Sequence, residues 1–183
     1  MNRLKRWGKE LMVLLLLVVG GSLAMDWLRV LLLLVVVVSL AMDWLRSPQA
    51  PTNWSDTSRQ TLAGKVVSLS EMSQEKPLLI YFWATWCGVC KFTTPTVNQL
   101  VQEGENVLTV ALRSGDPAQV ETWLRKKGYP LPVINDPQGE LSAQWQINVT
   151  PTVVILYQGK MVQHTSGWTS YWGMKLRLWL ESF

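Results

Sequence analysis

The stretch that decides the fold reads Trp83-Ala84-Thr85-Trp86-Cys87-Gly88-Val89-Cys90-Lys91, and it holds the only two cysteines of the 183-residue chain. It follows the apolar run Leu78–Phe82, which is short, opens after a proline and is typical of a buried strand. The residues from Lys91 to Val101 predict a helix. Cys87 is therefore expected at a strand-to-helix turn, where unpaired backbone N–H groups and the positive end of the helix dipole favour a thiolate.

The spacing of the two cysteines favours a catalytic redox pair. Cys90 would lie one helical turn further in, more buried, and able to attack a mixed disulfide on Cys87. A purely structural disulfide is the first alternative, but such a small loop stabilises little. A metal site is the second, but two cysteines exclude a Cys₄ zinc site and His164 is the only histidine.

The segment from Phe82 to Lys91 resembles the active-site segment of the thioredoxin superfamily, and most of all that of its TlpA-type branch of membrane-anchored, extracytoplasmic members. A second signature, Val149-Thr150-Pro151-Thr152, stands before the apolar run Val153–Tyr157. The resemblance extends from about Thr61 to the C-terminus. Within the branch, the tail Ser166–Arg177 resembles the ScsD group, the suppressor-of-copper-sensitivity proteins.

Five residues besides the cysteines are expected to contribute to the site, and the resemblance implies the roles of two of them. Pro151 would be cis and face the pair, and the backbone N–H and C=O of Thr150 would bind a partner peptide like an added strand. Trp86, Gly88 and Val89 are expected to shape the pair from their positions alone: Trp86 would cover an apolar docking face beside Cys87, and the dipeptide Gly88-Val89 would influence the redox potential. The alternative for Trp86 is a packed core tryptophan, and for Pro151 an ordinary trans proline at a strand start.

Two positions depart from the family pattern. Tyr81 stands where many thioredoxins carry a buried Asp, and Thr93 stands where some TlpA-type members carry a Glu. No obvious carboxylate is left to take the proton of Cys90. Water, Lys91 or a carboxylate brought in by the fold are the alternatives.

Elsewhere strands and helices alternate before a final hairpin. Strands are expected at Thr61–Leu69 (or a hairpin around Gly64), Asn106–Leu112, Leu131–Ile134, Thr152–Tyr157 and Met161–Thr165, and helices at Pro117–Lys127, Gln138–Gln146 and Thr169–Ser182. Asp116 is the expected N-cap of the first of these helices, and Gly128 its C-terminal stop. The order predicts an α/β thioredoxin-like fold, with a central mixed β-sheet flanked by helices on both faces.

Residues 1–46 predict a membrane anchor helix ahead of this domain. A cationic start, Met1–Lys9, precedes apolar residues from Leu11 onward, as in a signal peptide or an uncleaved anchor. The segment contains a tandem repeat, Val13–Arg29 and Val30–Arg46, identical except at two adjacent positions. One copy is expected to span the membrane and the other to lie at its interface or extend the stalk. Residues 47–60 are expected to be a linker and residues 61–183 the thioredoxin-like domain.

The charge of the chain argues against nucleic-acid binding. Its net charge is +4, and six basic and three acidic residues within 1–46 account for most of the excess. A nucleic-acid-binding domain needs a basic face on the folded part.

Together these features predict a protein-disulfide oxidoreductase that acts as a reductase of partner disulfides. In the setting that the resemblance implies, it would be a single-pass inner-membrane protein with its catalytic domain in the periplasm, linked to copper or oxidative stress. Its partners would be protein disulfides and a membrane reductase of the DsbD kind, and it would need no cofactor or metal.

The alternatives are a cytochrome c maturation thioreductase, a redox-inert binding module and a copper-binding protein, although Met161 and Met174 are scattered. The terminal Trp168, Trp172 and Trp179, with Tyr171, favour packing over a partner-docking or membrane-interface face.

Overall fold

The computed structural model describes residues 27–28, 30–35, 37–38, 48–51, 54 and 58–182. The chain divides into two compact units, Met1–Leu45 and Arg46–Phe183. In the first unit the described residues are helical and their apolar side chains are exposed. Among the residues described, none of the helices combines the length and the apolar character that a membrane crossing requires. Most of the predicted anchor lies outside the described residues.

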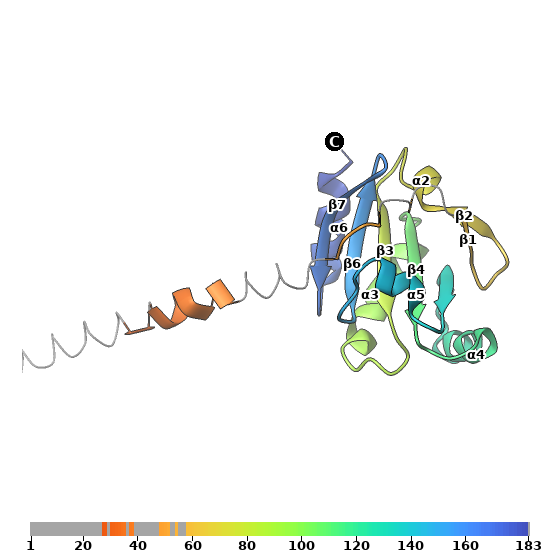
Figure 1. Ribbon diagram of the computed structural model, residues 1–183, viewed down its shortest axis with the longest axis horizontal. Coiled ribbons are helices and arrows are strands. Elements are labelled where there is room, and N and C mark those ends of the chain that lie inside the picture. The colour runs from red at the N-terminus through yellow and green to blue at the C-terminus, as the bar shows by residue number, and fades with distance from the viewer. Residues whose placement is uncertain are drawn as a thin grey trace, which may run out of the picture. The chain divides into compact units, whose positions relative to one another are not determined.

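The second unit is built on a five-stranded mixed sheet, as the alternation of elements predicted (Figure 1). Its strands, in spatial order, are β5 (Val133–Asp136), β4 (Val107–Leu112), β3 (Leu78–Trp83), β6 (Thr152–Tyr157) and β7 (Lys160–Ser166). β3, β4 and β5 are parallel, whereas β6 runs antiparallel to β3 and β7 antiparallel to β6.

Helices cover both faces of the sheet, so every residue of β3 is buried. Alternate β3 side chains enter two separate clusters, because successive side chains of a strand point to opposite faces. Leu79, Tyr81 and Trp83 pack with residues of α3 (Cys90–Gln102), α4 (Pro117–Lys127) and α6 (Tyr171–Leu180). Leu78, Ile80 and Phe82 pack with residues from β2 (Val66–Ser68), α2 (Leu69–Met72) and α5 (Glu140–Gln144).

Capping and turn residues in the sequence correctly predict where several helices and strands begin or end. Asp116 caps α4, since its carboxylate accepts the backbone N–H of Gln119 at 2.8 Å, and the Gln119 side chain binds back to the Asp116 N–H. Gly128 ends the helix with a φ of +69°, a conformation that glycine adopts without a Cβ penalty. The β6–β7 hairpin turns on Gln158 and Gly159, both with positive φ, as two-residue hairpin turns require.

The linker expected at 47–60 differs from what the structure shows. β1 (Ser58–Gln60) lies inside it and pairs antiparallel with β2. The Gln49 backbone N–H donates to the Trp145 carbonyl at 3.1 Å, and the ring of Trp54 lies 5.9 Å from that of Trp145. Trp54 is buried because it covers apolar side chains on one sheet face. At the described positions the chain is therefore packed on the domain from residue 48, and not only from residue 61.

Candidate active site

Both cysteines lie where β3 leads into α3. Cys87 is in the turn that follows the strand, and Cys90 is the first residue of the helix. The two form a disulfide, with Cα atoms 5.3 Å apart. Both are mostly buried, with exposed fractions of 6% for Cys87 and 2% for Cys90. The order of exposure is the one expected for an attacking and a resolving cysteine, with the difference in exposure small.

The sulfur of Cys87 meets two backbone groups. The Cys90 N–H donates to Cys87 Sγ at 3.1 Å, and the Thr150 carbonyl oxygen lies 3.5 Å from the same sulfur. The N–H is one of the unpaired donors at the start of α3, where the helix dipole is also positive. In the reduced protein both would favour a thiolate on Cys87, and a protonated Cys87 could donate to Thr150.

The loop that carries Pro151 is held beside the cysteines by the sheet. β3 and β6 run antiparallel with Phe82 opposite Thr152, so the end of one and the start of the other share one edge. The Thr150–Pro151 peptide bond is cis. Thr152 Oγ1 donates to the Val149 carbonyl at 2.8 Å, and the Gly167 N–H donates to the Pro151 carbonyl at 2.8 Å. Two segments about sixty residues apart in sequence thus form one site.

Exposed apolar side chains surround the pair. Trp86 is 63% exposed, so it is not a packed core tryptophan, and its Nε1–H donates to the Arg113 carbonyl at 3.0 Å. Gly88 and Val89 are exposed as well. Phe92 is 71% exposed and lies three residues after Val89. The sequence interpretation missed Phe92, although positions i and i+3 lie on one side of a helix.

Neutral hydroxyl groups occupy the two positions where the resembled proteins carry carboxylates. Tyr81 is fully buried, and its hydroxyl lies 3.0 Å from Thr94 Oγ1. Burial raises the pKa of Tyr81 far above its ordinary value, so its hydroxyl stays protonated and cannot act as a base. Thr93 is also fully buried, and its hydroxyl donates to the Val89 carbonyl at 3.5 Å. Neither residue can accept the proton of Cys90.

The residues considered for copper do not converge. Met174 belongs to the cluster on the α3 side of the sheet and Met161 to the cluster on the other side. His164 lies on β7 opposite Val154. Among the described residues, no group of three or more His, Cys, Asp and Glu side chains is placed to hold a metal ion.

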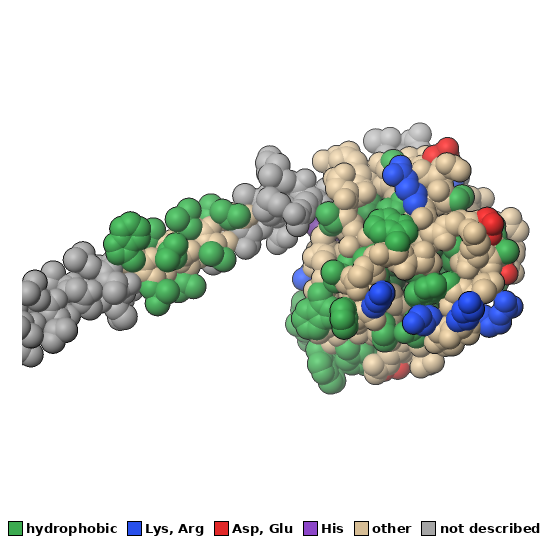
Figure 2. Space-filling model, turned by 90° about the horizontal axis from the view of Figure 1, so that it is seen from below, with side chains coloured by type: hydrophobic (Ala, Val, Ile, Leu, Met, Phe, Trp, Pro, Cys, Tyr) green, Lys and Arg blue, Asp and Glu red, His purple; other side chains and the backbone are tan. Residues whose placement is uncertain are grey.

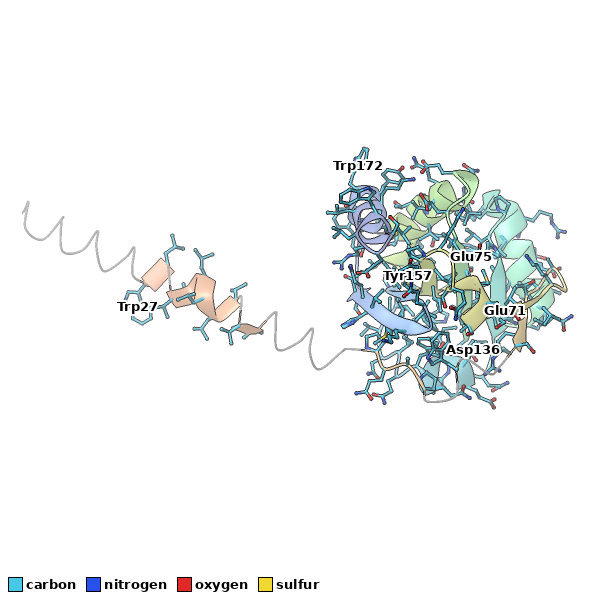
Figure 3. The ribbon with its side chains drawn as sticks, turned by 90° about the horizontal axis from the view of Figure 1, so that it is seen from above. Trp27, Glu71, Glu75, Asp136, Tyr157 and Trp172 are labelled. Carbon is cyan, nitrogen blue, oxygen red and sulfur yellow. A yellow bond between two sulfur atoms is a disulfide. The ribbon has the colours of Figure 1, made fainter. Side chains whose placement is uncertain are left out.

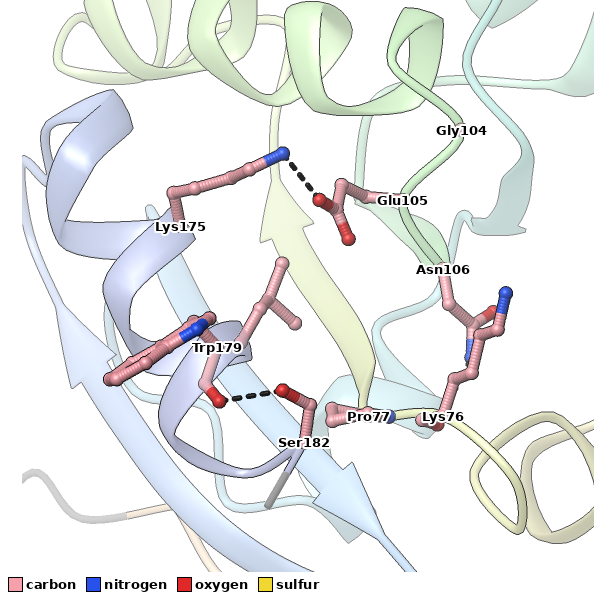
Figure 4. A pocket seen from close by; sticks show the side chains of 9 residues that line it. Lys76, Pro77, Gly104, Glu105, Asn106, Lys175, Trp179 and Ser182 are labelled. Atoms are coloured by element: carbon pink, nitrogen blue, oxygen red, sulfur yellow. Dashed lines mark hydrogen bonds and ion pairs between the residues drawn. The ribbon is translucent and has the colours of Figure 1, made fainter.

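A hollow of about 330 Å³ lies at the opposite end of β3 from Cys87 (Figure 4). Its lining includes Pro77, which directly precedes β3, together with Glu105 and Lys175. It is therefore separate from the redox pair.

Comparisons with known proteins agree with this geometry. Residues 49–165 match the model of the AhpC/TSA family. The chain is 49% identical over 138 residues to a thioredoxin-like protein of Haemophilus influenzae, covering 75% of this chain and 83% of that one. It is 30% identical to the thioredoxin-like protein YneN of Bacillus subtilis, covering 63% and 67%.

A solved structure extends the likeness to the fold. The pneumococcal exposed lipoprotein thioredoxin Etrx1 of Streptococcus pneumoniae superposes with a TM-score of 0.60 at 26% identity, covering 68% of this chain and 98% of its own. With a Cys-x-x-Cys disulfide at the start of α3 and a cis proline beside it, the chain belongs to the AhpC/TSA family and is a thioredoxin-like protein-disulfide oxidoreductase whose redox centre is its own cysteine pair.

Proposed function

We propose that the protein reduces disulfides in partner proteins outside the cytoplasm, while tethered to the inner membrane by its N-terminal segment. In the reduced enzyme, the Cys87 thiolate attacks one sulfur of the partner. A Cys87–partner disulfide forms, the partner's own disulfide breaks, and its other sulfur leaves as a thiolate. Cys90 then loses its proton and attacks Cys87 Sγ, which releases the second partner thiolate. Two electrons pass to the partner, and the proton of Cys90 goes to a released thiolate or to water.

The observation that carries this assignment is the Cys90 N–H donated to Cys87 Sγ at 3.1 Å. It identifies Cys87 as the sulfur that the start of α3 stabilises when negative. The exposed side chains of Trp86, Val89 and Phe92 beside it offer an apolar surface on which a partner can dock.

The reducing direction is supported by the resemblance to TlpA-type members, which implies re-reduction by a membrane reductase. A protein that is kept reduced in this way reduces the disulfides of its partners. Its potential is then expected near that of thioredoxin, about −270 mV, and not near −120 mV, the value of a strong oxidant.

The sequence and one structural relative support a location outside the cytoplasm, at the membrane. A cationic start before an apolar segment is typical of an anchored, exported chain. The structural relative Etrx1 is described as an exposed lipoprotein thioredoxin. Re-reduction by a membrane reductase of the DsbD kind, and a role in copper or oxidative stress, follow from the resemblance of Ser166–Arg177 to the ScsD group.

Four measurements test the proposal. The equilibrium potential of the purified protein against glutathione should lie nearer −270 mV than −120 mV, and a value near the latter would reverse the direction. A periplasm-dependent reporter fused after Ser47 should be active, and a silent reporter would contradict the location. In cells, the Cys87–Cys90 pair should be found mainly reduced, and oxidised when the membrane reductase is deleted. Loss of c-type cytochromes instead of copper tolerance in a deletion strain would favour the maturation role.

A further inference from the structure

Helix α6 carries apolar residues on the side where a surface helix is usually polar. Met174 and Leu178 are buried against the domain. On the outer side, Trp172, Leu176, Trp179 and Leu180 are exposed, from 52% for Leu180 to 76% for Trp172. Their spacing of three and four residues puts them in one stripe, here called the outer stripe. Figure 2 shows hydrophobic side chains gathered at the left end of the domain, where α6 lies, and Trp172 projects from the edge of the domain in Figure 3.

The polar residues of the helix are turned toward the domain. Lys175 Nζ forms an ion pair with Glu105 (Figure 4) and a second one, at 3.1 Å, with Glu103. The Tyr171 hydroxyl donates to Glu103 at 2.8 Å. Arg177 donates to the Gln163 side chain on β7 at 3.0 Å. These contacts fix the rotation of α6 about its axis, so the outer stripe faces away from the domain. Lys175 and Arg177, the two charged residues of the helix, are held against the domain on either side of the stripe.

The part of the chain before the domain indicates what covers this stripe. The apolar N-terminal segment ends at Leu45, and Gln49 is already hydrogen-bonded to Trp145. Four residue steps of extended chain reach at most about 14 Å. If the copy nearer the domain, Val30–Arg46, is the one that spans the membrane, the domain has no long stalk and lies close to the lipid surface. Tryptophan, like tyrosine, is enriched at the boundary between lipid and water.

We propose that the outer stripe of α6 lies in the interfacial layer of the membrane that holds the N-terminal segment. The proposal rests on the anchoring stated under Proposed function, with Val30–Arg46 as the spanning copy. It also orients the active site. Exposed Trp168 precedes α6, and the backbone N–H of its neighbour Gly167 donates to the Pro151 carbonyl. The rim of the active site would therefore open near the membrane surface. Partners that are themselves membrane-bound would then meet Cys87 most readily.

The test uses the full chain, with Cys87 and Cys90 kept as their disulfide, in nanodiscs of phosphatidylethanolamine and phosphatidylglycerol. A nitroxide label is attached to the new thiol in Leu176→Cys. The matched control is Lys126→Cys, at an exposed position on α4. Power saturation compares the access of oxygen, which concentrates in lipid, with that of a water-soluble nickel chelate. The oxygen-to-nickel ratio should be several-fold higher at position 176 than at position 126.

The outcomes separate this inference from the anchoring on which it rests. Failure of the full chain to float with lipid would refute the anchoring itself. Flotation with equal ratios at the two positions would overturn the membrane contact of α6 alone. Spin–spin broadening at position 176, seen in vesicles with many copies but not in nanodiscs with one, would assign the stripe to a second copy instead. Adding Trp172→Glu should lower the ratio at position 176 to the control value while flotation persists.

Discussion

The substitution Tyr81→Phe removes one hydroxyl from the most buried part of the site. It breaks the 3.0 Å contact between that hydroxyl and Thr94 Oγ1, both within fully buried residues. A net hydrogen bond contributes about 0.5–1.5 kcal/mol, and an unpaired buried hydroxyl adds about 1–3 kcal/mol. Because Thr94 can turn its hydroxyl back to a carbonyl in its own helix, we expect a loss of about 1–2 kcal/mol at pH 7.

Raising the pH should erase this difference. Burial raises the pKa of Tyr81 above its ordinary value in the folded protein, whereas in the unfolded chain it titrates near 10. The phenol therefore stabilises the fold fully below pH 10, and that contribution declines above pH 10 because only the unfolded chain ionises. At pH 11 the unmodified protein has lost about 1.4 kcal/mol of the stabilisation that the Tyr81 phenol provides at pH 7. The variant has no phenol at this position, so the two proteins should become about equally stable there.

The assay is urea unfolding of both proteins at pH 7 and pH 11, with the disulfide intact so that neither cysteine titrates. All other tyrosines and lysines are shared and cancel in the comparison. A stability difference that is unchanged between the two pH values would show that Tyr81 ionises equally in both states, and the reasoning would fail. Turnover should have the same pH profile below pH 9 in both proteins, since a phenol that stays protonated accepts no proton from Cys90.

Three further predictions concern the site and the packing around it. Cys90→Ser should accumulate mixed disulfides on Cys87, visible on non-reducing gels, whereas Cys87→Ser should accumulate few; the reverse pattern would exchange their roles. Trp54→Ala should lower the free energy of unfolding by about 3–5 kcal/mol, while Trp86→Ala, which loses one exposed hydrogen bond, should lower it by at most about 1.5 kcal/mol, and equal effects would contradict the packing of the segment before β1. Gly128→Ala should destabilise by about 1–2 kcal/mol from its positive φ alone, because a Cβ there meets no atom within 4 Å; no change in the unfolding midpoint would argue against that conformation.

Much of the fold could be predicted because it is written in local patterns. Leu78–Phe82 is apolar without alternation, which is typical of a strand buried on both faces, and β3 is such a strand. Asp116 and Gly128 mark the ends of α4 by the chemistry of unpaired backbone groups. The sequence also brought Cys87 and Thr150 together, but only through a resemblance, because sheet register is not visible in local composition.

Long-range packing accounts for what the sequence did not reveal. Residues 47–60 are polar enough to resemble a linker. Trp54 nevertheless packs on the domain, because its ring contacts that of Trp145, about ninety residues later in the chain. The sequence pattern places Phe92 in a helix, but it does not show which side of α3 is left uncovered by the core. The Lys175 side chain points toward the domain because it pairs with Glu103 and Glu105, which belong to another part of the chain.

The antiparallel register of β3 and β6 bears on where the chain tolerates insertions. Residues added between Trp83 and Cys87, or between Val149 and Pro151, would move one half of the site against the other, since Phe82 is fixed opposite Thr152. The Gln158–Gly159 turn lies at the opposite end of β6, where the chain turns back into β7. An epitope tag or a natural insertion there would lengthen the hairpin without shifting either sulfur. Variation in length among homologues should therefore collect at that turn, and the two site loops should keep a constant number of residues.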